Sequence, residues 1–203
     1  NTLIVYTSDN GFFLGEHGLF DKRLMYEPSI RVPMLVRHPA SIPAGQVNRK
    51  QMLLNVDVAP TFLDAGGAPH APAMQGRSWL SIAQGKRVTD WRKDFLYEYF
   101  EFPAAHCVRK HRGVRTDRWK LIHWDYPEGW ELYDLVSDPN EQRNLAGMPQ
   151  YAMQQAQLRA RLEDLRRELG DADPPGYVPG DPPDLSHCKP GMQRTGGLIL
   201  EQG

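Results

Sequence analysis

The sequence predicts an α/β chain in which part of a large mixed sheet precedes a small four-stranded antiparallel sheet packed with one helix. Two short apolar runs, Leu3–Tyr6 and Met34–Val36, are typical of strands in a buried sheet. Later segments rich in aromatic and β-branched residues alternate with tight turns, and leucines then recur at helical spacing. We therefore expect a first domain over 1–90, a small antiparallel-sheet domain over 91–170, and a tail over 171–203.

The first domain is expected to contain two strands and one helix. The run Leu3–Tyr6 ends abruptly in polar residues, as a strand buried on both faces does, and Pro33 stands where the second strand begins. A helix is predicted over about Val58–Ala65, ended by the glycine pair that follows it. Asn55 or Asp57 can cap this helix, and Asp57 is expected to be a cap rather than a ligand.

The second domain is expected to be a sheet with one helix on it. The predicted strands lie at 95–100, 112–116, 119–124 and 130–135. Leucines at spacings of four, three and four predict an amphipathic helix over about 148–170 that covers one face of the sheet; they are Leu158, Leu162, Leu165 and Leu169. From Asp171 the chain is rich in Pro, Gly and Asp, which predicts an extended or poorly ordered tail.

Composition limits the possible partners and context of the chain. The 203 residues carry a net charge of −1, so whole-chain electrostatics give no reason to expect nucleic acid or another polyanion as partner. No apolar run is long enough for a membrane span. The two cysteines, Cys107 and Cys188, allow one disulfide at most and settle no redox compartment. The sequence has no initiator Met and opens on what looks like an interior strand, so we expect the carboxy-terminal portion of a longer protein.

The first candidate site follows the first predicted strand. Ligands of open α/β sheets collect at the carboxyl ends of strands, and here the chain carries Asp9 and Asn10 before Gly11. A carboxylate and an amide oxygen suit a hard cation such as Ca²⁺ or Mg²⁺. The same three residues also form a common turn, and spacing alone does not decide between the two interpretations.

A longer pattern favours the metal site. The segments SDNG, GEHGLFDK and MYEPSIRVPMLVR resemble the second metal-site segment of the sulfatase family, in the alkaline phosphatase superfamily. The resemblance implies a sulfuric ester hydrolase in which Asp9 and Asn10 bind the metal, which would be Ca²⁺ with Mg²⁺ left open. It also implies that Lys22 is a catalytic residue that holds a sulfate oxygen.

The resemblance continues through the second domain. The segments RGVRTDRWKLIHW and ELYDLVSDPNEQRNL resemble the carboxy-terminal subdomain of sulfatases. Within the family the sequence is most similar to glycan sulfatases, including N-acetylglucosamine-6-sulfatases. This implies a sulfated small molecule or glycan as substrate, and an extracytoplasmic location (periplasmic, secreted or lysosomal).

The nucleophile of the family is expected upstream of this chain. Sulfatases attack with a formylglycine made from Cys or Ser in a C/S-x-P-x-R motif. Three partial matches start at Ser41, Ser137 and Cys188, but none ends in Arg and all follow the Asp-Asn pair. We therefore expect a missing N-terminal portion to supply the nucleophile and the first metal segment, and we expect the chain alone to be inactive.

The remaining candidates are histidines. His17 lies in the GEHG loop near Lys22, where it would contact substrate or be held by backbone groups. His106 and His111 belong to a basic stretch ending at Arg118, which is either a contact for a sulfated glycan or a solvated face.

Two rival functions stay open. One is a phosphonate or phosphate ester hydrolase of the same superfamily, which would share these metal segments. The other is a noncatalytic module in which the basic hairpin binds anionic glycans and the Asp-Asn pair is vestigial.

Overall fold

The computed structural model describes residues 2–101, 107–173, 175 and 177, and it divides the chain into two compact units. The first unit joins Asn1–Asp9 to Val32–Lys93, and the second joins Asn10–Arg31 to Asp94–Gly203. Residues 10–31, which the sequence analysis assigned to the first domain, therefore group with the small sheet.

The first unit contains a two-stranded sheet of β1 (Ile4–Tyr6) and β4 (Leu35–Arg37). The strands pair antiparallel, with Val5 opposite Val36. The expectation of a strand buried on both faces is wrong for the chain as described. Ile4 and Tyr6 are 50% and 63% exposed, because alternate side chains of a strand point to opposite faces and one face of this pair is open.

The predicted helix of the first unit is α2 (Val58–Gly66), and Gly67 ends it in the left-handed conformation with φ of 69°. Asp57 precedes α2 but does not cap it with its side chain. Its buried carboxylate accepts bonds from Arg92 at 2.5 and 2.6 Å and from the backbone N–H groups of Leu54 and Arg77 at 2.8 Å. Asp57 thus ties together the loops that lead into and out of α2 and the short α3 (Leu80–Ala83).

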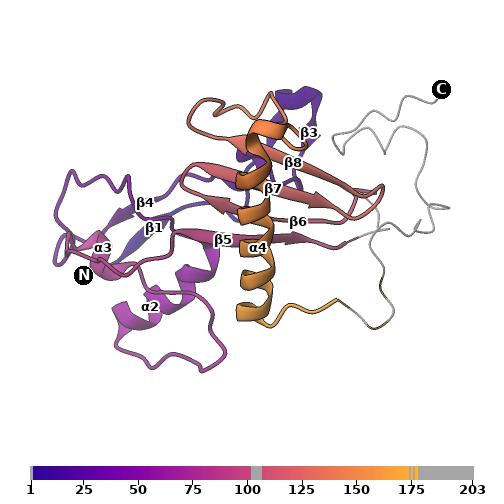
Figure 1. Ribbon diagram of the computed structural model, residues 1–203. Coiled ribbons are helices and arrows are strands. Elements are labelled where there is room, and N and C mark those ends of the chain that lie inside the picture. Colours follow the sequence, from indigo (N-terminus) through magenta and orange to yellow (C-terminus); the bar gives the residue numbers. More distant parts are fainter. Residues whose placement is uncertain (1, 102–106, 174, 176, 178–203) are drawn as a thin grey trace. The chain divides into compact units, whose positions relative to one another are not determined.

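The second unit is built on a four-stranded antiparallel sheet in the order β5-β6-β7-β8 (Figure 1). The strands are β5 (Asp94–Tyr99), β6 (His111–Thr116), β7 (Trp119–Trp124) and β8 (Gly129–Asp134). Each lies within one residue of its predicted position. Tight turns join β6 to β7 and β7 to β8, which sets a register in which Leu121 lies opposite Val114 on one side and Leu132 on the other.

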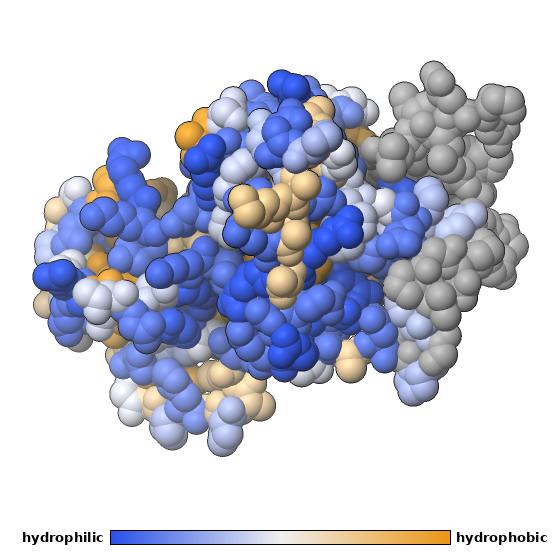
Figure 2. All heavy atoms as spheres, in the orientation of Figure 1, coloured by the Kyte–Doolittle hydropathy of each residue, from blue (hydrophilic) through white to orange (hydrophobic). Residues whose placement is uncertain are grey.

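Helix α4 (Ala152–Leu169) covers one face of this sheet, as predicted, and Figure 1 shows it crossing the strands. Its buried residues Leu158, Leu162 and Leu165 pack against Val114, Leu121 and Leu132 of the sheet. The surface around α4 is mostly hydrophilic in Figure 2, as expected for the outer face of an amphipathic helix.

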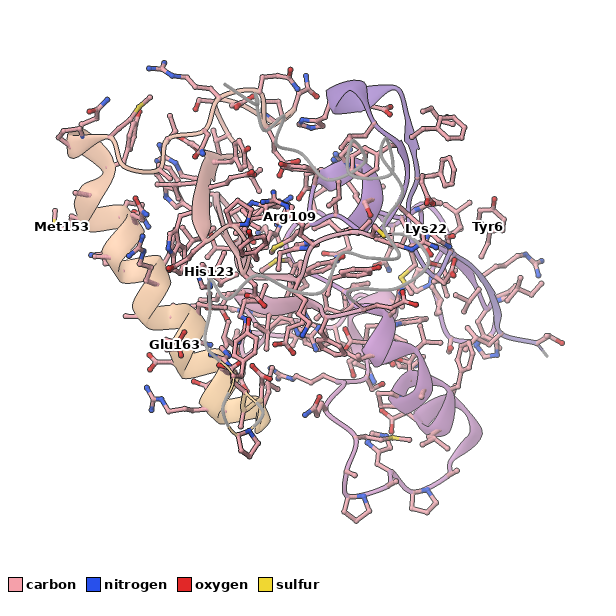
Figure 3. All side chains as sticks on the ribbon, turned by 90° about the vertical axis from the view of Figure 1, so that its right-hand side faces the viewer. Tyr6, Lys22, Arg109, His123, Met153 and Glu163 are labelled. Carbon is pink, nitrogen blue, oxygen red and sulfur yellow. The ribbon has the colours of Figure 1, made fainter. Side chains whose placement is uncertain are left out.

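The opposite face of the sheet is covered by residues 13–30, which the sequence analysis did not predict. This segment contains the hairpin of β2 (Phe13–Leu14) and β3 (Phe20–Asp21) and the four-residue helix α1 (Glu27–Ile30). Its buried side chains form a second core with those of β7 and β8. This core includes Phe13, Leu24, Met25, Tyr26, Ile122, Trp124 and Tyr133. In Figure 3 the sheet lies between α4 and the segment that carries Lys22.

The predicted fold class, a mixed α/β chain with a four-stranded antiparallel sheet and one long helix, is confirmed. Among the described residues, no helix is long and apolar enough to cross a membrane. Most of the predicted tail lies outside the described residues. Near its start, Asp171 and Asp173 form ion pairs with Arg166 at 2.5 and 2.8 Å.

Candidate active site

The predicted sulfate contact Lys22 and the predicted metal ligand Asn10 lie against each other in the second unit. Both are half-buried, and the Lys22 Nζ donates a hydrogen bond of 3.0 Å to Asn10 Oδ1 (Figure 3 labels Lys22). The Asn10 Nδ2 donates to the backbone oxygen of Gly11 at 2.6 Å, which fixes the amide orientation. This hydrogen bond therefore holds a cation and an amide oxygen together at one point of this unit.

Helix α1 holds the backbone beside both residues. The N–H groups of Gly11 and Phe12 donate to the oxygens of Ser29 and Pro28 at 2.7 and 2.9 Å. The N–H of Arg23 donates to the Ser29 Oγ at 3.2 Å. Each of the two site residues is thus followed directly by a residue that is hydrogen-bonded to α1.

Gly11 is the residue that allows this close approach. A Cβ at position 11 would lie 2.0 Å from the Pro28 oxygen and 3.0 Å from the Ser29 oxygen. Any other residue would push the chain away from α1, so glycine is needed here for space.

Asp9 belongs to the first unit and is exposed. Its carboxylate accepts a hydrogen bond of 3.3 Å from Ser8 Oγ, and its backbone oxygen accepts one from Asn55 Nδ2. The oxygen atoms of Asp9 and of Asn10 have the chemistry that Ca²⁺ or Mg²⁺ prefers, but Ca²⁺ takes six to eight such ligands. Among the described residues, no cluster of three or more His, Cys, Asp or Glu side chains could hold a metal ion. The two side chains have suitable oxygen atoms, and their role as metal ligands stays a prediction.

His17 lies in the loop before β3, in the left-handed conformation with φ of 54°. Its half-buried ring stacks on Tyr26 at 4.5 Å between centroids. Burial, reinforced by the nearby Lys120 charge, lowers the pKa of His17, so the neutral imidazole is favoured at neutral pH. Phe13 meets the same ring edge-on, which fixes its plane.

His111 is only 1% exposed. Its ring stacks against Tyr97 and Tyr99 and lies tilted against Trp124, and its Nδ1 lies 2.8 Å from the Arg109 backbone oxygen. Burial lowers its pKa to about 4, and its Nε2 has no hydrogen-bond partner among the described residues. His106 lies outside the described residues. The substrate-binding roles of His17, His106 and His111 remain predictions.

The basic stretch is largely paired with acidic groups of its own unit. Arg112 lies 2.8 Å from Asp173, and Arg118 lies 2.8 Å from Asp134. Arg109 covers the face of Trp124 at 4.4 Å. These contacts favour a structural role for the charges over a free anion-binding surface.

Sequence reasoning missed a buried charge cluster next to α1. Lys120 is fully buried, and its Nζ lies 2.9 Å from Glu27 Oε1 and 2.5 Å from Glu141 Oε1. Arg115 also contacts Glu27 at 3.3 Å. The signal was the strand alternation, since Lys120 shares its face of β7 with the buried Ile122 and Trp124.

Cys107 takes part in a disulfide bond, while Cys188 lies outside the described residues.

Comparison with known proteins supports the resemblance read from the sequence. The family model of the N-sulphoglucosamine sulphohydrolase C-terminal region matches residues 15–168. An N-acetylglucosamine-6-O-sulfatase of Bacteroides thetaiotaomicron is 47% identical over 178 residues, which are 86% of this chain and 32% of that protein.

Solved structures of a sulfatase and of a related hydrolase share the fold. One, described as in complex with its substrate D-glucosamine-2-N,6-O-disulfate, has a TM-score of 0.81 and 44% identity, over 87% of this chain and 36% of that one. The other, a phosphonate monoester hydrolase of Agrobacterium radiobacter, has a TM-score of 0.72 and 25% identity, over 83% of this chain and 35% of that one. The chain thus spans about a third of the length of these relatives. It belongs to the N-sulphoglucosamine sulphohydrolase C-terminal family, which places it among the sulfatases.

Proposed function

We propose that this chain is the carboxy-terminal portion of a metal-dependent sulfatase that removes a sulfate ester from a glucosamine-containing glycan. The observation that carries the proposal is the contact of Lys22 with Asn10, 3.0 Å apart in a loop held by α1. Similarity to a protein named N-acetylglucosamine-6-O-sulfatase, and to one solved with a disulfated glucosamine, supports the substrate class.

Hydrolysis of a sulfate ester requires groups that stabilise negative charge on the sulfuryl oxygens and on the leaving oxygen. A fixed ammonium acts more strongly on such charge in a partly dry site than in water, and Lys22 is half-buried and held by Asn10. Lys22 would bind a sulfate oxygen, with His17 as a neutral hydrogen-bonding group beside the substrate.

A divalent cation fits the donor chemistry of the site in part. Asp9 and Asn10 would supply two oxygen ligands to Ca²⁺, or to Mg²⁺. When bound, the cation would neutralise charge on the sulfate group. The formylglycine nucleophile and the remaining ligands would come from residues upstream of Asn1. An extracytoplasmic location goes with this family assignment.

A second candidate, hydrolysis of phosphonate or phosphate monoesters, is favoured by the similarity to a phosphonate monoester hydrolase. A tetrahedral phosphonate would make the same contact with Lys22. The two candidate substrates differ in the charge and in the geometry of the group that is attacked. Activity measurements with both substrates therefore distinguish the two candidate functions.

The test uses the longer enzyme that contains this chain, with sulfate release from 6-O-sulfated N-acetylglucosamine and phenol release from a phenyl phosphonate as parallel assays. Lys22→Ala is expected to lower kcat for the sulfate ester by about 10²–10³-fold, since loss of one charge-stabilising donor typically has that effect. The matched control is Lys86→Ala, which removes an exposed loop lysine. If Lys22→Ala keeps kcat within twofold of wild type, Lys22 is not the sulfate contact. If the phosphonate is the better substrate, the second candidate replaces the first.

A further inference from the structure

We propose that Glu27, Lys120 and Glu141 are positioning residues for the Asn10–Lys22 pair, acting through helix α1. The catalytic meaning of this proposal rests on the proposed function, but its structural claim does not.

The cluster is a buried ionic link between the sheet and α1. Lys120 on β7 is 0% exposed, and its ammonium bridges Glu27 at the start of α1 and Glu141 in the loop after β8. Glu141 also accepts the backbone N–H of Glu27 at 2.7 Å, across 114 positions of sequence. Glu141 therefore binds both the cation and the first turn of the helix.

The charges in the cluster balance. Burial favours neutral carboxyl groups, yet Lys120 and Arg115 together outweigh it at Glu27 and lower the pKa of that residue. At Glu141 burial prevails over the single cation Lys120 and the pKa is raised. Two cations and two carboxylates in contact are a cluster in which removal of one member leaves an uncompensated charge.

The backbone of Glu141 also indicates a specific role. It has φ of 54°, a left-handed conformation that is uncommon outside glycine, Asn and Asp. Such a conformation persists where the surroundings over-determine it. Here it lets the Glu141 side chain reach both Lys120 and the backbone of α1.

The position of helix α1 determines the positions of Asn10 and Lys22. The helix has four residues, too few for a stable helix of its own, so its position depends on outside contacts. Its two middle residues, Pro28 and Ser29, accept hydrogen bonds from the residues that follow Asn10 and Lys22, which are Gly11, Phe12 and Arg23. A shift of α1 would therefore move both site residues together.

The experiment measures amide hydrogen exchange in the 203-residue chain with Glu141→Gln, which removes the charge but keeps an acceptor for the Glu27 N–H. We expect Gly11, Phe12 and Arg23 to exchange about tenfold faster, while Val114 and Leu121 in the sheet change less than about twofold. The matched control is Asp94→Asn, which weakens the Arg161 ion pair (2.7 and 2.9 Å) between β5 and α4 of the same unit without touching α1. The control should leave the three site amides unchanged.

The proposal is overturned if the site amides and the sheet amides speed up together, or if both variants act alike on Gly11, Phe12 and Arg23. If Glu141→Gln does not fold, Arg115→Gln at a less buried position removes one of the two cations on Glu27, and a smaller, still selective effect on the same amides is expected. No effect on them in that variant would also overturn the proposal.

A kinetic arm in the longer enzyme separates this proposal from the proposed function. Glu141→Gln should lower kcat about tenfold with KM nearly unchanged, as expected when a charge that acts in the transition state is displaced. If Lys22→Ala leaves kcat unchanged, the catalytic role proposed for Lys22 fails, while the exchange data still decide whether the cluster positions the loop.

Discussion

Replacing Gly11 by alanine is expected to destabilise the second unit and to loosen the site. The new Cβ would lie 2.0 Å from the Pro28 oxygen, far inside van der Waals contact, so the chain must move away from α1. The hydrogen bonds from Gly11 and Phe12 to α1, 2.7 and 2.9 Å long, would be stretched or lost. Each is worth about 0.5–1.5 kcal/mol and the crowding costs about 1–3 kcal/mol, which gives a loss of about 2–6 kcal/mol.

The assay is equilibrium urea denaturation of the 203-residue chain, with tryptophan fluorescence as the signal that reports unfolding. The matched control is Gly129→Ala in the same unit, where the nearest atom to the new Cβ is the Pro127 oxygen at 3.9 Å, an ordinary contact. The control should stay within about 0.5 kcal/mol of wild type. If Gly11→Ala unfolds at the same urea concentration as Gly129→Ala, the close approach of this loop to α1 does not contribute to stability.

Three further outcomes are expected. Leu162→Ala should cost about 2–5 kcal/mol because this side chain of α4 is fully buried against the sheet, whereas Met153→Ala, at a position 76% exposed, should change the melting temperature little. Equal melting temperatures would mean that α4 is not docked. Calorimetry of the isolated chain should show only weak Ca²⁺ binding, since two side-chain oxygen ligands fall short of six, and submicromolar affinity would reveal ligands not recognised here. Burial, together with the neighbouring Asp171, raises the pKa of Glu98 to about 7, so its protonation contributes stability that is full below about pH 4.5 and lost as the pH rises through 7. Glu98→Gln should remove that part of the pH dependence in urea titrations, and identical pH profiles would contradict it.

The small sheet and its helix could be predicted because the chain contains both sides of the contact. Leu121 and Leu132 are inward on one face, and the leucines of α4 repeat at the spacing that meets them. The strand β1 was predicted with the right position and the wrong burial. The burial of a strand depends on which other elements pack on its faces, and apolar composition alone does not predict those elements.

Residues 13–30, which cover the face of the sheet opposite α4, could not be predicted from sequence periodicity. Their strands β2 and β3 have two residues each and α1 has four, so no element is long enough to show a period. The site residues Asn10 and Lys22 were predicted by resemblance, and the structure joins them by a hydrogen bond. Lys120 was missed because a lysine between apolar residues of a strand usually points to solvent.

The buried charges explain how a short helix can be held in one place. Apolar contacts hold α1 through Tyr26 and Ile30, but they are non-directional and tolerate small shifts. Two contacts of Glu27 are directional: its carboxylate lies 2.9 Å from the Lys120 Nζ, and its backbone N–H donates to Glu141. Together they fix the side chain and the backbone at the start of α1. Replacing such a cluster by apolar residues often leaves stability unchanged or raises it, so stability alone does not explain its presence. The sulfate contact proposed for Lys22 would explain it, since rate falls steeply when a catalytic group is displaced by about 1 Å.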